Sequence, residues 1–190
     1  MKIDRCLIDS GYMPGIIENV RHKFGSAIMA SKGVGIRAAS KPMSTYKRKP
    51  GERHGHHWYI PNINKTGEFP HVAIDTNYWK TFAHERLFIA PGDHGSLTLY
   101  GKSPHQHKLF AEHVAGSEVW VRTEGHGRVV YQWSPKPGGI DNHWLDCLVG
   151  CCVAGSMCGC LLTGHNVQGP SRREKIKLSD VQKRRHIGNV

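Results

Sequence analysis

The chain opens with Lys2-Ile-Asp-Arg-Cys-Leu-Ile-Asp9, followed at once by Ser10-Gly11-Tyr12. The apolar residues of this stretch are strand formers, and they stop at a carboxylate that is followed by Gly11 and Pro14. A buried strand that ends in an aspartate beside a glycine turn brings that aspartate to the edge of a sheet, where ligands bind. We therefore expect Asp9 to belong to a functional site toward which the chain brings further carboxylates.

The next residues predict a strand–helix–strand unit, which favours a parallel pair of strands. A helix is expected over residues 14–24, because Pro14 suits a first turn, Gly25 ends the segment, and the apolar residues form one stripe, namely Ile16, Ile17, Val20 and Phe24. A second strand is expected at residues 27–30. The segment 32–67 then reads as a long polar and basic excursion, of the kind that is usually functional or disordered.

The segment 71–75 repeats the design of the opening strand, with an apolar run that ends in Asp75 and a helix expected from there to about Leu87. Further along, the patterns predict a strand at 96–100, a helix at 106–114, and a hairpin formed by 118–122 and 128–133. Each aspartate taken alone is best interpreted as a helix cap. Two similar strand ends on one scaffold favour a shared site.

The last expected helix begins at Asp141 as its N-cap and continues to about Leu162. Its residues 147–162 carry no charge, but this run is shorter than the roughly 20 residues needed to span a membrane and is rich in glycine. We therefore interpret it as a helix packed on the sheet. His143 and Asp146 are three positions apart and share a face of this helix. A carboxylate such as Asp146 at the rim of a buried surface needs a cation, and a metal ion is one answer.

The charge of the 190-residue chain is concentrated in two segments. The formal net charge is +11, of which 32–53 contributes +6 and 171–190 contributes +5. We expect one domain over 1–165 and a basic tail over 166–190. Two basic segments on a neutral body suggest arms for a polyanion, most simply double-stranded DNA. The residues predicted to bind DNA are Lys32, Arg37, Lys41, Lys47, Arg48, Lys49, Arg53, Arg172 and Arg173.

Five of the six cysteines lie between positions 147 and 160, and none forms a C-x-x-C pair. Zinc binding through Cys147 and Cys151 would need further ligands. Reduced core cysteines in a cytoplasmic protein are the simpler interpretation. Charged residues follow Met1 immediately, so we expect no secretory signal.

Asp9, Asp75 and Asp146 together suggest metal-assisted phosphodiester hydrolysis. Two divalent ions about 4 Å apart need several anionic oxygens to hold them, and hard oxygen ligands select Mg²⁺ or Mn²⁺ over zinc. His143 could add a ligand or orient a water molecule. The basic arms would hold the DNA with little base readout.

The chain resembles the nuclease domain of tailed-bacteriophage terminase large subunits, in the lambda GpA-like branch. The resemblance spans about residues 3–162 and is carried by Cys6-Leu-Ile-Asp-Ser-Gly-Tyr12, Ile74-Asp-Thr-Asn-Tyr-Trp-Lys80 with Arg86-Leu87, Ala115-Gly-Ser-Glu118 and Asp141-Asn-His-Trp-Leu-Asp-Cys147. It implies an α/β fold with an RNase H-like mixed sheet flanked by helices. It also implies a two-metal endonuclease that cuts concatemeric viral DNA during genome packaging.

The resemblance carries particular roles to particular positions. Asp9 would be the metal ligand of the first strand, Asp75 the second acid, and Asp146 the acid on the helix, with His143 matching a His-x-x-Asp spacing. The partners implied are the packaging ATPase domain, the portal and the small terminase subunit, in the cytoplasm of the infected bacterial host. The chain contains no G-x-x-x-x-G-K-[ST] phosphate loop, so we expect the packaging ATPase elsewhere.

Two other functions fit the same residues. A non-enzymatic DNA-binding packaging module would use the basic arms without the carboxylates. A junction resolvase of the RNase H fold would use the carboxylates on branched DNA.

Overall fold

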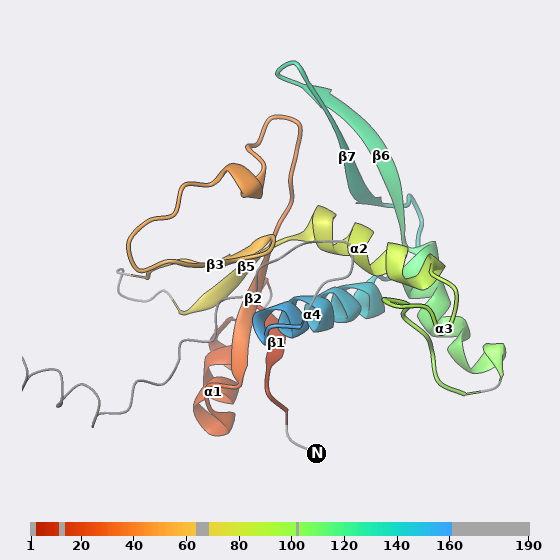
Figure 1. Cartoon of the computed structure of the whole chain (residues 1–190), viewed down its shortest axis with the longest axis horizontal. Helices are drawn as coiled ribbons and strands as arrows, with labels where there is room; N and C mark the ends of the chain where they lie inside the picture. The colour runs from red at the N-terminus through yellow and green to blue at the C-terminus, as the bar shows by residue number, and fades with distance from the viewer. Residues whose placement is uncertain (1–2, 12–13, 64–68, 102, 161–190) are drawn as a thin grey trace, which may run out of the picture.

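Five strands form one mixed sheet in the computed structural model of the chain, which describes residues 3–11, 14–63, 69–101 and 103–160 (Figure 1). The order across the sheet is β1-β2-β5-β4-β3. The strands β1, β2 and β5 run parallel, whereas β4 and β3 are antiparallel additions at the far side. Their bounds are β1 Cys6–Asp9, β2 Ile28–Val34, β3 Arg53–Gly55, β4 Trp58–Ile60 and β5 His71–Asp75.

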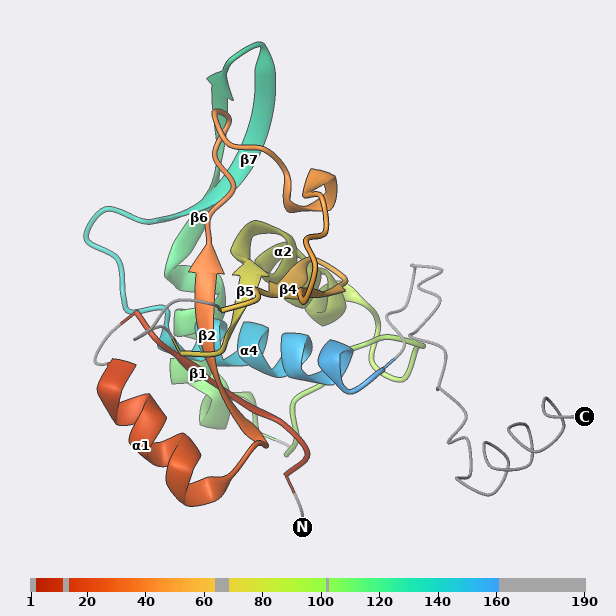
Figure 2. The same cartoon turned by 90° about the vertical axis from the view of Figure 1, so that its left-hand side faces the viewer.

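The predicted strand–helix–strand unit is present as β1, α1 (Pro14–Phe24) and β2. Gly25 follows the helix with a φ of +84°, a conformation that glycine adopts without strain. α1 lies on one side of β1 and β2, and α4 (His143–Met157) lies on the other (Figures 1 and 2). The mixed α/β sheet flanked by helices is thus confirmed.

The core lies between the sheet and the helices α2 (Thr76–Phe88) and α4. Residues that pair across neighbouring strands face the same side of the sheet. Leu7 of β1 pairs with Met29 of β2. Val72 and Ile74 of β5 pair with Ser31 and Gly33 of β2, which face the same side of the sheet as Met29. The four apolar strand residues all contact the helical side of the core, whose buried helix residues are Trp79, Phe82, Leu145, Val149 and Val153.

The predicted hairpin is formed by β6 (Glu118–Gly125) and β7 (Arg128–Pro135), which make a separate two-stranded sheet (Figure 1). Its base is tied to α2, because the backbone N–H of Trp133 donates to Asn77 Oδ1 at 3.1 Å and its indole N–H donates to Thr81 Oγ1 at 3.0 Å. The helix predicted at 106–114 is a succession of three helical forms: η2 (Pro104–His107), α3 (Lys108–Ala111) and the π-helical η3 (Glu112–Gly116).

Several sequence predictions need correction. The excursion 32–67 contains a short helix, η1 (Met43–Thr45), and the antiparallel pair β3 and β4, whose three-residue strands are too short to stand out in the sequence. Residues 96–100 form no strand, although the N–H of Leu97 donates to the carbonyl of Arg86 at 2.8 Å. Asp141 is not the N-cap of the last helix. Asn142 holds that position, without a side-chain cap bond, and α4 ends at Met157.

The tail predicted at 166–190, with Arg172 and Arg173, lies outside the described residues. None of the helices that the structure describes is both long and apolar enough to cross a membrane.

Leu145 provides a test of the core. Its side chain is fully buried between α4 and the sheet, so Leu145→Ala should lower the free energy of unfolding by about 2–5 kcal/mol. The matched control is Leu109→Ala on α3, where the residue is 55% exposed and a change within about 0.5 kcal/mol is expected. Urea unfolding monitored by circular dichroism measures both. Equal effects of the two substitutions would contradict this packing of α4.

Candidate functional site

Asp9 ends β1, and a turn bonded to β2 holds it there. Ser10 donates to the carbonyl of Ser31 through both its backbone N–H and its hydroxyl, each at 2.8 Å. The N–H of Gly11 donates to Asp9 Oδ1 at 3.2 Å. A Cβ at position 11 would lie 3.2 Å from Asp9 Oδ2, so glycine leaves room for the carboxylate at this turn. The chain thus fixes an exposed aspartate at the carboxyl end of the edge strand.

His143 and Asp146 come to the same place from α4. Leu145 is buried, and the next residue along a helix points about 100° away, which brings Asp146 to the rim of the core. The Asp146 side chain is 53% exposed. A pocket of about 740 Å³ between β1 and α4 is lined by Asp9, His143 and Asp146 together with Ser31. Three of the predicted metal ligands therefore share one pocket.

The carboxylates of this pocket could hold a hard cation that keeps part of its water shell, and Arg5 and four cysteines line the pocket as well. Within the described part of the chain, no three His, Cys, Asp or Glu side chains lie close enough to hold one metal ion by themselves. Mg²⁺, however, is commonly bound through one or two carboxylates, with waters and substrate phosphates completing its octahedron. Asp9 and Asp146 meet that requirement, since both are carboxylates open to the same pocket.

A buried ion pair adjoins Asp146. Lys80 of α2 donates to Glu118 Oε1 of β6 at 2.5 Å, and its ammonium also lies 3.3 Å from Asp146 Oδ1. The same Oε1 accepts a hydrogen bond of 2.7 Å from Asn142 Nδ2. The Lys80–Glu118 pair, Asn142 and Asp146 therefore form one network that joins α2, β6 and α4.

The sequence patterns do not assign a role to Lys80 or to Glu118. A signal for Lys80 is present, because it lies on the buried stripe of α2 between Trp79 and Ala83, where a lysine needs a partner. The position of Glu118 at the start of β6 offers no such physical signal, although the segment 115–118 is one of those that carry the family resemblance. Its partner Asn142 stands more than twenty residues away in sequence.

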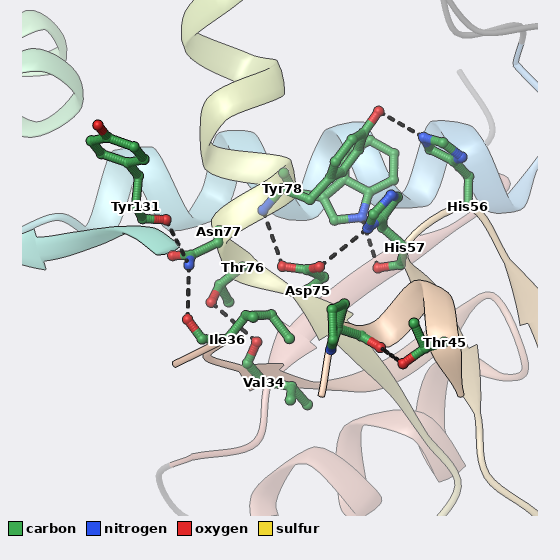
Figure 3. Close-up of polar contacts among 12 residues, drawn as sticks. Val34, Ile36, Thr45, His56, His57, Asp75, Thr76, Asn77, Tyr78 and Tyr131 are labelled. Carbon is green, nitrogen blue, oxygen red and sulfur yellow. Dashed lines mark hydrogen bonds and ion pairs between the residues drawn. The ribbon is translucent and has the colours of Figure 1, made fainter. Parts of the chain in front are cut away.

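Asp75 is not among the residues that line this pocket. Figure 3 shows the contacts that it makes instead. Its Oδ1 accepts from the N–H of Tyr78 at 3.0 Å, which makes it the N-cap of α2, and its Oδ2 lies 3.1 Å from His57 Nδ1. The His57 ring stacks on Tyr78 with centroids 3.7 Å apart. Burial is the main cause that raises the pKa of Tyr78 to about 12. Both carboxylate oxygens of Asp75 are thus engaged, one as the N-cap of α2 and the other with His57.

The register of the sheet explains this separation. Asp9 pairs with Ser31, and Ser31 pairs with Val72, so Asp75 lies three residues farther along the strands, roughly 10 Å away in that direction. An odd offset also turns its side chain to the opposite face of the sheet. The structure therefore brings Asp9 and Asp146 to one pocket and leaves Asp75 outside it.

The basic residues of 32–53 are exposed, and the segment that carries them lies against the hairpin. The exposed residues are Lys32, Arg37, Lys41, Lys47, Arg48, Lys49 and Arg53. Arg128 of β7 donates to the carbonyl of Ser40 at 2.7 Å, and Asn77 donates to the carbonyl of Ile36 at 3.1 Å. The single acid of the segment, Glu52, is bonded to His54 and to the N–H of Lys49, and the hydrogen bond from His54 is the first cause that lowers its pKa.

All six cysteines are free thiols in the structure, and the interpretation of them as core residues needs correction, since only Cys152 packs against the core cluster. Cys147, Cys151, Cys158 and Cys160 are exposed, and Cys6 and Cys152 are half-buried. Burial raises the pKa of the Cys152 thiol to about 11, and it also raises the pKa of Cys151. These two thiols are therefore largely protonated at neutral pH.

Comparison with known proteins points to one family. A model of the family described as terminase large subunit gpA, endonuclease domain, matches residues 1–163. No curated protein and no solved structure gives a significant match.

Asp75 can be tested as a cap. Asp75→Ala should lower the free energy of unfolding by about 1 kcal/mol, because the N–H of Tyr78 loses its acceptor. Asp75→Asn retains a capping oxygen and should lose less. Neither substitution should change Mn²⁺ binding measured by isothermal titration calorimetry. A loss of Mn²⁺ binding in a folded Asp75→Asn protein would place Asp75 in the metal site after all.

Proposed function

The chain belongs to the endonuclease-domain family of terminase large subunit gpA, and we propose that it cuts concatemeric viral DNA by metal-dependent phosphodiester hydrolysis. Asp9 and Asp146, carried by β1 and α4, line one pocket, and this observation carries the proposal. Asp9 would be held by its turn and Asp146 by the ion pair behind it, so both carboxylates are oriented before a cation arrives.

In this proposal Asp9 and Asp146 would hold two Mg²⁺ or Mn²⁺ ions. When bound, such ions would supply activation of a water as nucleophile and neutralisation of charge on the leaving 3′ oxygen. His143 lines the pocket beside Asp146, where its imidazole can accept or donate a proton at the entering water. The Asp141 carboxylate lies 3.7 Å from His143 Nε2 and can orient that ring.

The exposed basic segment 32–53 would hold the DNA. Its lysines and arginines do not form a motif that is known to recognise particular bases, so they fit contacts with the phosphate backbone. Five of the seven basic residues stand on the stretch between β2 and β3, which is hydrogen-bonded to α2 and to the hairpin, whereas Lys32 and Arg53 lie on β2 and β3 themselves. All seven are thereby attached to the sheet that carries the site.

The finer expectations from the resemblance belong to the same proposal. They are an RNase H-like fold for the sheet, a packaging ATPase domain, portal and small terminase subunit as partners, and the host cytoplasm as the place of action. The five-stranded mixed sheet flanked by helices supports the first of these.

Nicking of supercoiled plasmid in Mn²⁺ tests the enzyme. Asp9→Asn and Asp146→Asn should each lower the cleavage rate at least about a hundredfold while DNA retention persists, because the metal loses an anionic ligand. Asp93→Asn, at an exposed loop position that does not line the pocket, is the matched control and should cleave normally. Unchanged cleavage by both site variants would refute the assignment. DNA binding without cleavage by the wild-type chain would favour the non-enzymatic packaging module.

The DNA-binding role of 32–53 predicts a change in salt dependence. The double variant Lys47→Ala/Lys49→Ala should bind duplex DNA more weakly, and the slope of log affinity against log salt should fall by about 0.9 for each phosphate that the protein no longer neutralises. Lys23→Ala/Lys108→Ala removes the same charge from α1 and α3 and serves as the control. Fluorescence anisotropy over a range of KCl measures both. Equal slopes in the two variants would exclude the segment from the DNA interface.

A further inference from the structure

We propose that Lys80 and Glu118 are positioning residues, which orient Asp146 and set the strength with which the pocket holds a divalent cation. This inference rests on the proposed function. Lys80 contacts Glu118 at 2.5 Å and Asp146 at 3.3 Å, so a single ammonium bridges the site to a carboxylate behind it.

The bridge is buried to a degree that stability alone does not explain. The side chains of Lys80 and Glu118 are 11% and 4% exposed. A buried ion pair is often no more stabilising than apolar residues of the same size, because both charges lose their water. Within the described residues, Glu118 Oε2 is also buried without a hydrogen-bond partner, which adds to that cost. A pair maintained at such a cost calls for a functional reason.

The location of the pair supplies this reason. Glu118 balances the charge of Lys80, so Asp146 has a fixed cationic partner without facing an uncompensated positive charge. The Asn142 amide donates to the same Glu118 oxygen at 2.7 Å and stands immediately before His143, so it also ties the start of α4 to β6. The carboxylate of Asp146 is thereby held in one orientation and keeps its negative charge available to a cation.

His84 belongs to the surroundings of this pair. It lies one turn after Lys80 on α2 and stacks on Trp133 with ring centroids 4.3 Å apart. Burial is the first cause that lowers the pKa of His84, so the ring is neutral at pH 7 and leaves the charge balance of Lys80 and Glu118 unchanged. The balance around Asp146 therefore depends on the Lys80–Glu118 pair itself.

The test compares two variants of the full chain by Mn²⁺ titration, followed by electron paramagnetic resonance of the free ion. Glu118→Gln keeps the shape of the side chain and an oxygen acceptor for Lys80, but leaves the ammonium uncompensated beside Asp146. We expect its Mn²⁺ dissociation constant to rise about tenfold. Lys80→Met/Glu118→Gln removes both charges, and we expect a dissociation constant within about threefold of wild type.

The same two variants separate charge from orientation. The double variant should bind Mn²⁺ almost normally yet cleave plasmid at least about tenfold more slowly at saturating Mn²⁺, because Asp146 no longer has the ion-pair partner that orients it. Thermal unfolding of each variant confirms that the protein measured is folded. If Glu118→Gln does not fold, Lys80→Arg/Glu118→Asp keeps both charges and changes their reach. It should retain wild-type Mn²⁺ affinity and lose cleavage rate.

Two results would overturn the inference. The first leaves the proposed nuclease function intact, and the second overturns that function as well. The first result is that the wild type binds Mn²⁺ and that either folded Glu118→Gln binds it equally well or the double variant binds it as weakly as Glu118→Gln. In that case Lys80 and Glu118 do not set the cation affinity, and the proposed nuclease function stands. If neither the wild type nor Asp93→Asn binds Mn²⁺, the proposed function fails together with the inference.

Discussion

The packing of α4 against the sheet sets the geometry on which the site depends. Leu145, Val149 and Val153 fall on one side of the helix and are buried against β5 and α2. Asp146 follows Leu145 directly, so the burial of Leu145 that anchors the helix also turns the Asp146 carboxylate toward the edge strand β1. That strand ends at Asp9. Gly150, Ala154 and Gly155 also line this pocket, and their small size leaves open the space between strand and helix. The distance between the two carboxylates is therefore fixed by hydrophobic packing rather than by any direct bond between them.

Charge inside the core is the second constraint. Lys80 takes a position on the buried stripe of α2 that an apolar residue would normally fill. Glu118 at the start of β6 forms an ion pair with it. Burial of such a pair costs hydration on both sides, so a chain selected only for stability would replace it with apolar residues. Its presence beside a candidate metal ligand is typical of a site where orientation of the ligand matters more than the stability of the fold.

Local elements could be predicted well from the sequence, and long-range register much less. The apolar run before Asp9, the helix α1 and the alternation of β6 and β7 could be located without a structure, because each has a periodic pattern of its own. The predicted apolar stripe of α1 was only partly right, since Ile17 is buried whereas Ile16 and Phe24 are exposed. The position of Asp75 could not. Two strands that both end in aspartate look equivalent in sequence, but a stagger of three residues between β1 and β5 places the second aspartate on the other face of the sheet. The pair of Lys80 and Glu118 was equally hidden, since 38 residues separate its members.

Asp9 and Asp146 are proposed to hold the catalytic metal together, and the nuclease depends on that pairing. Anomalous diffraction from a Mn²⁺-soaked crystal tests it most directly, because manganese is located without reference to activity. We expect at least one anomalous peak within about 2.3 Å of a carboxylate oxygen of both Asp9 and Asp146, with waters completing the coordination. Manganese bound at Asp75 or at the surface, with the pocket between β1 and α4 free of it, would contradict the pairing.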